Sequence, residues 1–302
     1  MCMNFGLLSG CMWGLDTVIL GIAFGLVPFA GNANAAIVSA GMHDMASCLL
    51  LLIYMTYKSR VTNTLSAIKT KSGKVVALAA LIGGPIGMLG YLMAIKNIGP
   101  GYTAIISSFF PAVGSFLAVV FLKEKMNKKQ VLGLGIALVA IMLMGYSSVG
   151  TSSTGDIKLG IIGALLCVFG WGSEAVILTW GLKYGGIDDM SALQIRQTTS
   201  ALAYLVIILI QPNNFNLFTS AITTPSTLYI VAAALCGTLS YLFYYKALNI
   251  IGAARGMATN ITYCVFAIVF SFILLGQVPS VLEVVCSLLI MSGTLLCAAP
   301  QE

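Results

Sequence analysis

Charged residues are scarce in this chain. Of its 302 residues only 8% are Asp, Glu, Lys or Arg, whereas 59% are hydrophobic. A water-soluble domain carries about 25% charged residues. The shortage excludes an ordinary soluble globular protein and indicates an exterior that faces lipid.

Side chains that hold metals or form redox centres are also few. The chain has one histidine, and its eight cysteines are dispersed without the spacing of a metal or disulfide motif. No Walker-type phosphate-binding motif is present, which excludes the usual nucleotide site. Ser107, Ser108 and Ser115 stand near no obvious second catalytic group. We therefore expect no metal, no cofactor and no catalytic residues.

Long apolar runs are the feature that the sequence has in abundance. Runs of about 20 residues are long enough to span a bilayer as helices. Polar loops are predicted at 58–74 and 211–226, which are rich in turn-forming or charged residues. The ten predicted spans are 5–27, 35–57, 75–96, 101–122, 129–148, 158–181, 192–211, 225–250, 254–275 and 280–299.

The net charge of +6 comes from Lys and Arg in short clusters between these runs. Such clusters are typical of membrane-protein loops and argue against a nucleic-acid partner. With both termini in the cytoplasm, thirteen cations lie inside and two, Lys96 and Lys158, lie outside. This bias predicts cytoplasmic termini, and the first helix is expected to remain as a span because no signal-peptide pattern precedes it.

The two halves of the chain resemble each other. WGLDTVIL (13–20) matches WGSEAVIL (171–178), with an offset of 171 − 13 = 158. YLMAIKNIG (91–99) matches YYKALNIIG (244–252), with an offset of 244 − 91 = 153. We predict two five-helix repeats, 1–150 and 151–302. Because five is odd, the second repeat is inverted, which places a substrate site near the membrane midplane where the halves meet.

These features carry a family resemblance that covers the whole chain. The chain resembles EamA-type members of the drug/metabolite transporter superfamily, whose helix pair ends in a Leu-x-Glu-like turn followed by a glycine-rich helix. Here that turn is Leu122 and Glu124, followed by Gly133 and Gly135. The second copy departs from the pattern, with Gln277 in place of the acid.

Within the superfamily, the chain is most similar to bacterial choline importers of the LicB type. The resemblance implies import of choline across the bacterial cytoplasmic membrane, driven by the proton gradient. It also implies a small cationic substrate, protons and membrane lipids as partners. The matching stretches are FGLLSGCMWGL (5–15), MHDMAS (42–47), GGPIGM (83–88), GWGSEAVIL (170–178), QIRQTTSALAYLV (194–206) and SYLFYYKAL (240–248).

Ionisable residues within the spans are candidates for the site, because burying each charge costs about 2.5–3.5 kcal/mol. Asp16 lies about eleven residues into the first span, roughly 16 Å deep at 1.5 Å per residue. Glu174 lies comparably deep in the sixth span, and Asp44 lies in the second. Glu283 begins the last span, where an interfacial position explains it. Asp16, Asp44 and Glu174 are the predicted substrate-binding carboxylates.

Aromatic residues accompany two of these acids. Trp13 and Trp171 each stand three positions before an acid, and residues three apart share a face of a helix. A quaternary ammonium such as choline cannot donate a hydrogen bond from nitrogen, so aromatic faces and a carboxylate are suited to bind it. Other predicted substrate contacts are Tyr241, Tyr244, Tyr245, Asn260 and Tyr263. An interfacial belt or helix packing is the alternative role for each tyrosine.

Proton coupling and gating require further groups. Glu174, Asp44 and His43 are the candidates for carrying the coupling proton. His43 could instead lie at the outer interface. Arg196 is the candidate gate residue near the cytoplasmic face, where it could pair with an acid such as Glu174 or extend to lipid phosphates.

Glycines have predicted packing and bending roles. Gly10/Gly14 and Gly21/Gly25 have the spacing that permits close helix approach. The glycines and Pro85 within 83–87 are expected to weaken and bend the third span.

Other functions remain open at the level of sequence. An exporter of amino acids or of cationic drugs would use the same residue types, and the direction of transport cannot be read from one sequence. A receptor or scaffold with a transporter fold is a further alternative. An intramembrane enzyme is disfavoured by the missing nucleophile and metal ligands.

Overall fold

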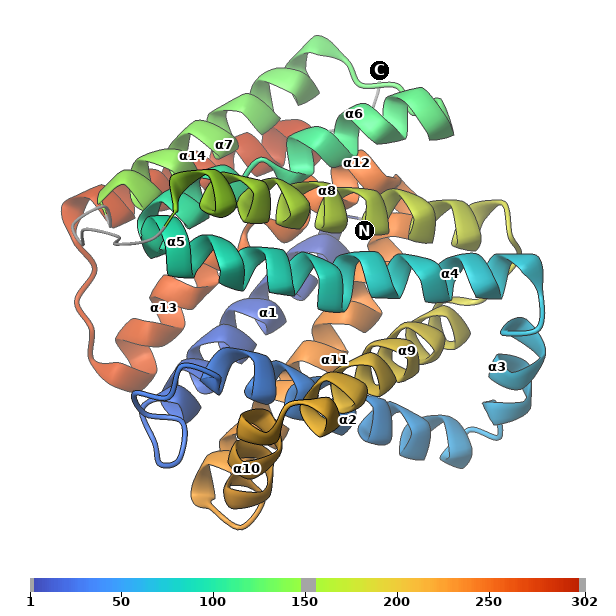
Figure 1. Cartoon of the computed structure of the whole chain (residues 1–302). Coiled ribbons are helices and arrows are strands. Elements are labelled where there is room, and N and C mark those ends of the chain that lie inside the picture. Colours follow the sequence, from blue (N-terminus) through green and yellow to red (C-terminus); the bar gives the residue numbers. More distant parts are fainter. Residues whose placement is uncertain (1–2, 148–155, 299–302) are drawn as a thin grey trace.

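The computed structural model describes residues 3–147 and 156–298, which form a bundle of helices with no strand among them (Figure 1). The elements in chain order are α1 (Met3–Phe24), α2 (Ala35–Tyr57), α3 (Val61–Ala67), α4 (Lys71–Leu81), the π-helical turn η1 (Ile82–Ile86), α5 (Gly87–Ser107), α6 (Phe110–Leu122), α7 (Lys128–Ser147), α8 (Ile157–Lys183), α9 (Asp189–Ile210), α10 (Pro212–Ala221), α11 (Pro225–Ile251), α12 (Ala253–Asn260), α13 (Tyr263–Leu275) and α14 (Val281–Ala298).

Nine helices in the described part of the chain are long and apolar enough to cross a membrane. The protein is therefore an all-α polytopic membrane protein. The tenth predicted span, 280–299, coincides with a shorter apolar helix, Val281–Cys297. The count of ten thus stays a prediction. Residues 148 and 299, at the ends of two predicted spans, and the predicted repeat boundary at 150/151 lie outside the described residues.

Both predicted polar loops contain a helix, so the loop predictions are wrong in this respect. Residues 58–74 include α3 and the beginning of α4, where the Thr70 side chain caps the helix by accepting from Gly73 N at 3.0 Å. Residues 211–226 include α10, which begins at Pro212. Proline suits a first helical position because its fixed φ is helical. It lacks an N–H group, but an N–H at this position would have no acceptor within the helix.

The fourth and ninth predicted spans are each interrupted, which the hydropathy pattern did not indicate because apolar residues continue through both breaks. The first break lies between Ser107, where α5 ends, and Phe110, where α6 begins. The second lies between Asn260, where α12 ends, and Tyr263, where α13 begins. The breaks are related by one offset: 260 − 107 = 153 and 263 − 110 = 153. Interrupted helices free backbone groups and are found around transporter sites.

Left-handed backbone positions recur at the same offset. Gly99 has φ 80° and Gly252 has φ 89°. Lys123 has φ 54° and Gly276 has φ 67°. The differences, 252 − 99 and 276 − 123, are both 153. This is the offset of the match between 91–99 and 244–252, whereas the match between 13–20 and 171–178 has an offset of 158. The agreement is consistent with two repeats, and the repeat boundaries and the inverted relation stay predictions.

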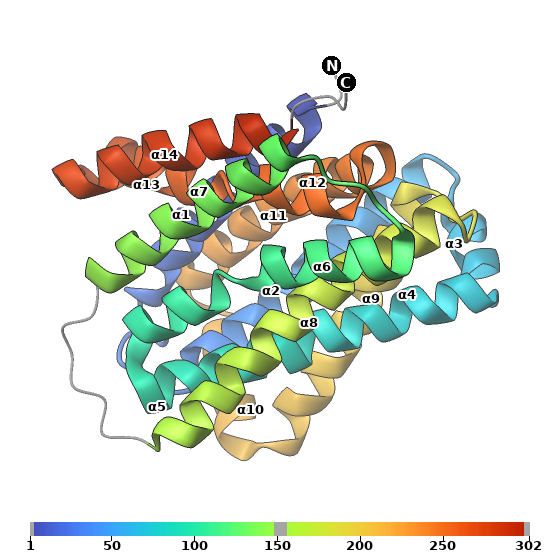
Figure 2. The ribbon, with the colours of Figure 1, turned by 90° about the horizontal axis from the view of Figure 1, so that it is seen from above.

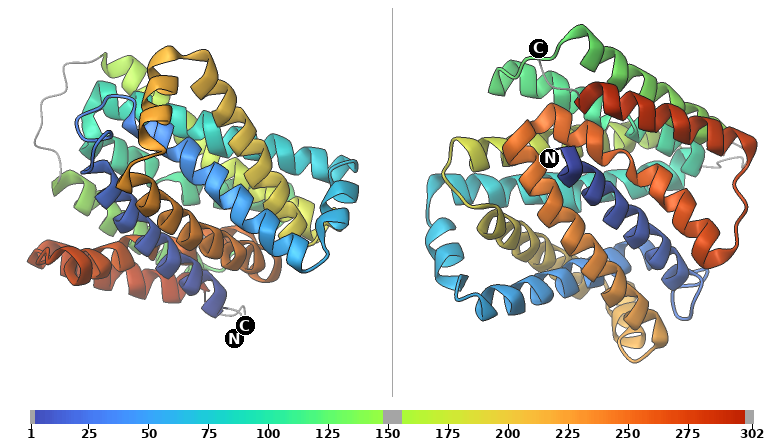
Figure 3. Two further views of the ribbon diagram at one scale, coloured as in Figure 1. Left: turned by 90° about the horizontal axis from the view of Figure 1, so that it is seen from below. Right: turned by 180° about the vertical axis from the view of Figure 1, so that it is seen from behind.

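Helix α1 approaches α13 closely at Gly10 and Gly14, as their spacing predicted. A Cβ on Gly14 would lie 2.7 Å from the backbone nitrogen of Ala267. By contrast, no other helix among the residues that the structure describes approaches Gly21 or Gly25. A Cβ on Gly21 would meet no atom within 4 Å, and one on Gly25 would lie 3.5 Å from the carbonyl oxygen of Ile22. Figure 2 shows α1 beside α13, and Figure 3 shows α7 along α14.

We call the end of the bundle that carries loops 58–74 and 123–129 the basic end. A buried apolar cluster fills this end, with members that include Met55, Leu122, Leu182, Ile187 and Leu248. Glu124 adds a polar closure, because its Oε1 accepts from Ala253 N at 2.8 Å and its Oε2 from Ala254 N at 3.1 Å. These amides begin α12, where a negative charge is favoured by the helix dipole.

Candidate functional site: a charged cavity in the centre of the bundle

A cavity of about 200 Å³ lies where α1, α2, α8, α9 and α11 meet. The structure brings most of the predicted site to this one place. His43 and Arg196 line the cavity together with eight of the ten predicted substrate contacts: Trp13, Asp16, Asp44, Trp171, Glu174, Tyr241, Tyr244 and Asn260.

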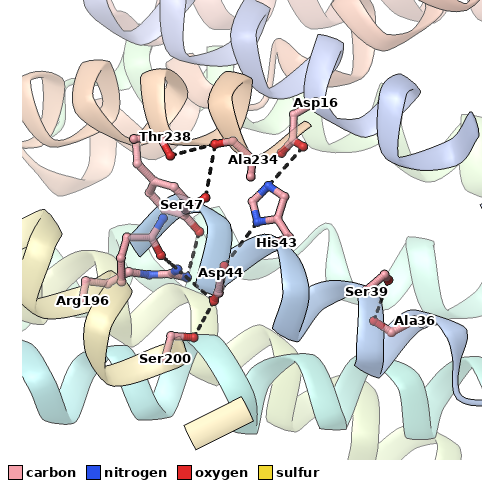
Figure 4. A network of polar contacts seen from close by, with 12 residues as sticks. Asp16, Ala36, Ser39, His43, Asp44, Ser47, Arg196, Ser200, Ala234 and Thr238 are labelled. Carbon is pink, nitrogen blue, oxygen red and sulfur yellow. Dashed lines mark hydrogen bonds and ion pairs between the residues drawn. The ribbon is translucent and has the colours of Figure 1, made fainter. Parts of the chain in front are cut away.

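His43 lies between two carboxylates (Figure 4). Its Nδ1 lies 3.3 Å from Oδ1 of Asp44, and its Nε2 lies 3.2 Å from Oδ1 of Asp16, which is an ion-pair distance without hydrogen-bond geometry. The three side chains come from α1 and α2 and are 6–8% exposed. His43 therefore faces the cavity, and an interfacial role is not supported.

Arg196 joins two carboxylates from different helices. Its Nε donates to Oε1 of Glu174 at 3.2 Å, and one terminal nitrogen donates to Oδ2 of Asp44 at 3.4 Å. The other terminal nitrogen donates to the Tyr241 hydroxyl at 2.8 Å. Arg196 is 4% exposed. It pairs with acids in the centre of the bundle, so the alternative in which it extends to lipid phosphates is wrong.

The charges of this cluster do not balance. Asp16, Asp44 and Glu174 contribute −3 when ionised and Arg196 contributes +1, so −3 + 1 = −2 with neutral His43 and −1 with protonated His43. Unpaired buried charge is costly unless a counter-ion compensates it. The cavity is therefore suited to hold positive charge.

Aromatic rings supply much of the remaining surface. Trp171 has Phe110 edge-on at 5.7 Å between ring centroids and Tyr91 at 5.6 Å. Trp13 stacks on Tyr263 at 4.0 Å. Trp13 and Trp171 belong to α1 and α8, and both line the cavity. Their π-faces are suited to a cation that cannot donate hydrogen bonds.

Two of the predicted tyrosine contacts lie elsewhere. Tyr245 is fully buried in the apolar cluster of the basic end, and Tyr263 lines a second cavity behind Trp171. The three tyrosines of α11 do not share one environment. Tyr241 and Tyr244 face the cavity, whereas Tyr245, the next residue along the helix, is turned about 100° from Tyr244.

A small uncharged polar group lies at the wall. Asn260 Nδ2 donates to Ser9 Oγ at 2.6 Å, and Ser9 Oγ lies 3.1 Å from Ser240 Oγ. Asn260 and Ser240 line the cavity. They offer hydrogen-bond partners for a hydroxyl on a ligand. Within the described ranges, 3–147 and 156–298, no group of three His, Cys, Asp or Glu side chains could hold a metal ion.

The π-helical turn η1 makes room for this cluster at the position that its glycines and proline predicted. A Cβ on Gly83 would overlap the carboxylate of Glu174, and one on Gly84 would lie 2.7 Å from Ser200 Oγ. On α11, a Cβ on Gly237 would lie 2.7 Å from His43 Nε2. Bare backbone at these glycines lets the charged side chains fit between helices.

Sequence reasoning missed several supporting residues. Ser200 donates to Oδ2 of Asp44 at 2.5 Å, and Gln197 Oε1 accepts from Arg196 at 2.7 Å. Both lie in the 194–206 stretch of the family resemblance, and Ser200 stands four residues after Arg196 on the same helical face, but neither was singled out. Ser9 and Ser240 also lie within stretches of the resemblance, but isolated serines in apolar helices are common, so neither was singled out.

Comparison with known proteins agrees with this architecture. The EamA-like transporter family matches residues 1–146 and 158–299. The chain is 29% identical to Protein LicB of Haemophilus influenzae over 292 residues, covering 96% of this chain and 95% of LicB. It is 24% identical to the uncharacterized transporter YyaM of Bacillus subtilis, covering 92% and 90%.

A solved structure described as a crystal structure of a protein superposes with a TM-score of 0.72 at 14% identity, covering 98% of this chain and 95% of that one. This likeness supports the fold. The family match spans nearly the whole length of the chain in two segments, one in each half. The chain belongs to the EamA-like transporter family.

Proposed function

We propose that the protein imports choline or a related quaternary ammonium compound, coupled to protons, by alternating access. The observation that carries this proposal is a buried cavity lined by three carboxylates, one arginine, one histidine and the rings of tryptophan and tyrosine. A trimethylammonium group needs charge compensation and aromatic contact rather than hydrogen-bond acceptors. Its hydroxyl would find Asn260 and Ser240 at the cavity wall.

The cavity also bears on the alternative substrates. Its volume of about 200 Å³ is below the roughly 300–1,000 Å³ of pockets for drug-sized ligands, which disfavours an exporter of bulky drugs. An amino-acid zwitterion would bring its own carboxylate to a cavity where Arg196 is already shared by Asp44 and Glu174. A compact cation without an acid group is the better fit.

The charge count supports coupling to one proton. With neutral His43 the cluster carries −2, so one substrate cation and one proton together neutralise it. His43 can accept that proton between Asp16 and Asp44, and Glu174 remains a candidate carrier beside Arg196. An interior-negative potential adds about 2.3 kcal/mol per 100 mV for each positive charge.

The proposed orientation places the basic end in the cytoplasm of a bacterial cell, with both termini on that side. Two inverted repeats, 1–150 and 151–302, would then close alternately around the cavity. In this structure the apolar cluster and Glu124 seal the basic end. This arrangement corresponds to a carrier closed toward the cytoplasm.

Flux into proteoliposomes tests the proposal. Labelled choline should accumulate under an inward proton gradient and be displaced by trimethylammonium compounds, but not by neutral or zwitterionic amino acids. Collapse of the proton gradient with a protonophore should lower accumulation more than collapse of the potential alone. Transport of amino acids with no choline flux would refute the substrate, and accumulation that is indifferent to the proton gradient would refute the coupling.

A further inference from the structure

A second cavity, of about 260 Å³, lies beside the central one. It is lined at one end by residues near the ends of α7 and α14, namely Met144, Gly145 and Glu283. At the other end it reaches the two helix breaks, through Ser108 and Ile261. Because α7 ends and α14 begins opposite the basic end, the cavity runs from that opposite end toward the middle of the bundle. We call it the entry cavity.

The entry cavity and the central cavity share a wall. Phe110 and Trp171 line both, and their rings meet edge to face at 5.7 Å between centroids. Tyr91 contacts Trp171 from the entry side at 5.6 Å. These two side chains form part of the wall between the two cavities.

The lining of the entry cavity repeats the chemistry of the central cavity in a weaker form. Tyr91, Tyr263 and Trp171 present aromatic surface, and Glu283 is the carboxylate among the described lining residues. Glu283 accepts from Ser280 N at 2.7 Å and from Ser280 Oγ at 2.8 Å, so its position is fixed. Among residues 3–147 and 156–298, the hydrogen-bond partner of the Glu283 carboxylate is the uncharged Ser280, so no ion pair there neutralises its charge.

We propose that the entry cavity is a transient binding site for the transported quaternary ammonium, which Glu283 attracts and the aromatic residues hold before it crosses the wall of Phe110 and Trp171. This inference rests on the proposed function for the identity of the cation. It assigns Glu283 a role in substrate arrival, which is separate from the role of the central carboxylates in tight binding. A lipid chain is the competing occupant, since part of the lining is apolar.

Thiol labelling tests the site without requiring transport. Ser108→Cys would place a thiol at the inner part of the entry cavity, in a protein whose native cysteines are replaced and which retains uptake. Two impermeant methanethiosulfonate reagents are applied from the side opposite the basic end, one carrying trimethylammonium and one carrying sulfonate. We expect the cationic reagent to react at least about fivefold faster, as charge steering toward a single carboxylate predicts.

The dependence on Glu283 is the decisive comparison. Glu283→Gln should remove most of the preference for the cationic reagent. Asp156→Asn is the matched control, because Asp156 is an exposed acid at the same end and asparagine can cap α8 equally well. It should leave the preference unchanged. Equal rates for both reagents, or a preference that survives Glu283→Gln, would overturn the proposal.

Two further measurements separate this inference from the proposed function. Choline should slow labelling, and Glu283→Gln should raise KM for uptake by about threefold at low salt with little change in kcat. A Glu283-dependent preference without choline protection or uptake would refute choline as the substrate and leave the cation entry site standing. Choline uptake with no labelling at Ser108→Cys, and none at the rim variant Met144→Cys, would refute the entry site, and a cavity filled by lipid would give this result.

Discussion

Replacing Glu174 by glutamine tests the centre of the proposed mechanism. The substitution preserves the shape of the side chain and removes one of the three carboxylate charges. Two unit charges about 5 Å apart interact by about 3.3 kcal/mol at an effective dielectric constant of about 20. Arg196, 3.2 Å from Glu174, offsets part of this attraction in the native protein. We therefore expect a loss of about 2–3 kcal/mol, or about 30- to 150-fold in Kd.

Calorimetry on the purified protein at several pH values would measure this loss. Glutamine cannot exchange a proton, so with Glu174 as the proton carrier Glu174→Gln should also remove most of the pH dependence of choline binding. A pH dependence that survives the substitution would assign the proton to His43. Asp16→Asn is the companion variant. Because no arginine in the described part of the chain offsets the charge of Asp16, this substitution should lower the affinity for choline at least as much as Glu174→Gln. Asp156→Asn serves as the control outside the cavity.

The competing account makes Glu174 a structural partner of Arg196 in a gate. It predicts slower turnover with choline affinity and its pH profile near those of the native protein. An unchanged affinity together with an unchanged pH profile would refute the assignment of Glu174 to the substrate and proton site. A large effect of Asp16→Asn in the same experiment would then transfer the role to Asp16.

Three further predictions concern other parts of the molecule. Trp171→Ala should weaken choline binding by about 1–3 kcal/mol in the same assay, and Trp171→Phe by less, whereas equal losses would exclude a cation–π role. Glu124→Gln should weaken the closure at the α12 amides by about 0.5–2 kcal/mol, seen as faster hydrogen exchange there, and unchanged exchange would count against that closure. Single thiols at exposed Thr70 and Asn213 should be labelled from the cytoplasm and from outside, respectively; the reverse pattern would overturn the orientation.

The sequence predicted the helices and much of the cavity for a common physical reason. Apolar length reports the lipid exposure of each span, and an acid inside such a span has to face other protein groups. Trp13 with Asp16 and Trp171 with Glu174 could be paired because residues three apart share a helical face. These pairs do line one cavity.

Contacts between helices were beyond the reach of the sequence. Spacing within α2 does not reveal that His43 meets Asp16 from α1, because the rotation and neighbour of each helix are set by packing of the whole bundle. The same limit misplaced Arg196, which is central although its span begins only a few residues earlier. Tyr245 is an error in the other direction. Its spacing from Tyr241 predicted a substrate contact, but its side chain packs in the apolar cluster of the basic end.

The sharing of Arg196 between Asp44 and Glu174 has a consequence for the way this protein can change over evolution. Removing one member of a buried ionic set typically costs 3–5 kcal/mol, whereas replacing the whole set by apolar residues can be nearly neutral. Asp44 and Glu174 stand on α2 and α8, in different halves of the chain, and both depend on one guanidinium. Single substitutions at these three positions should be purged, so descendants of this chain are expected to keep the trio intact or to lose it together.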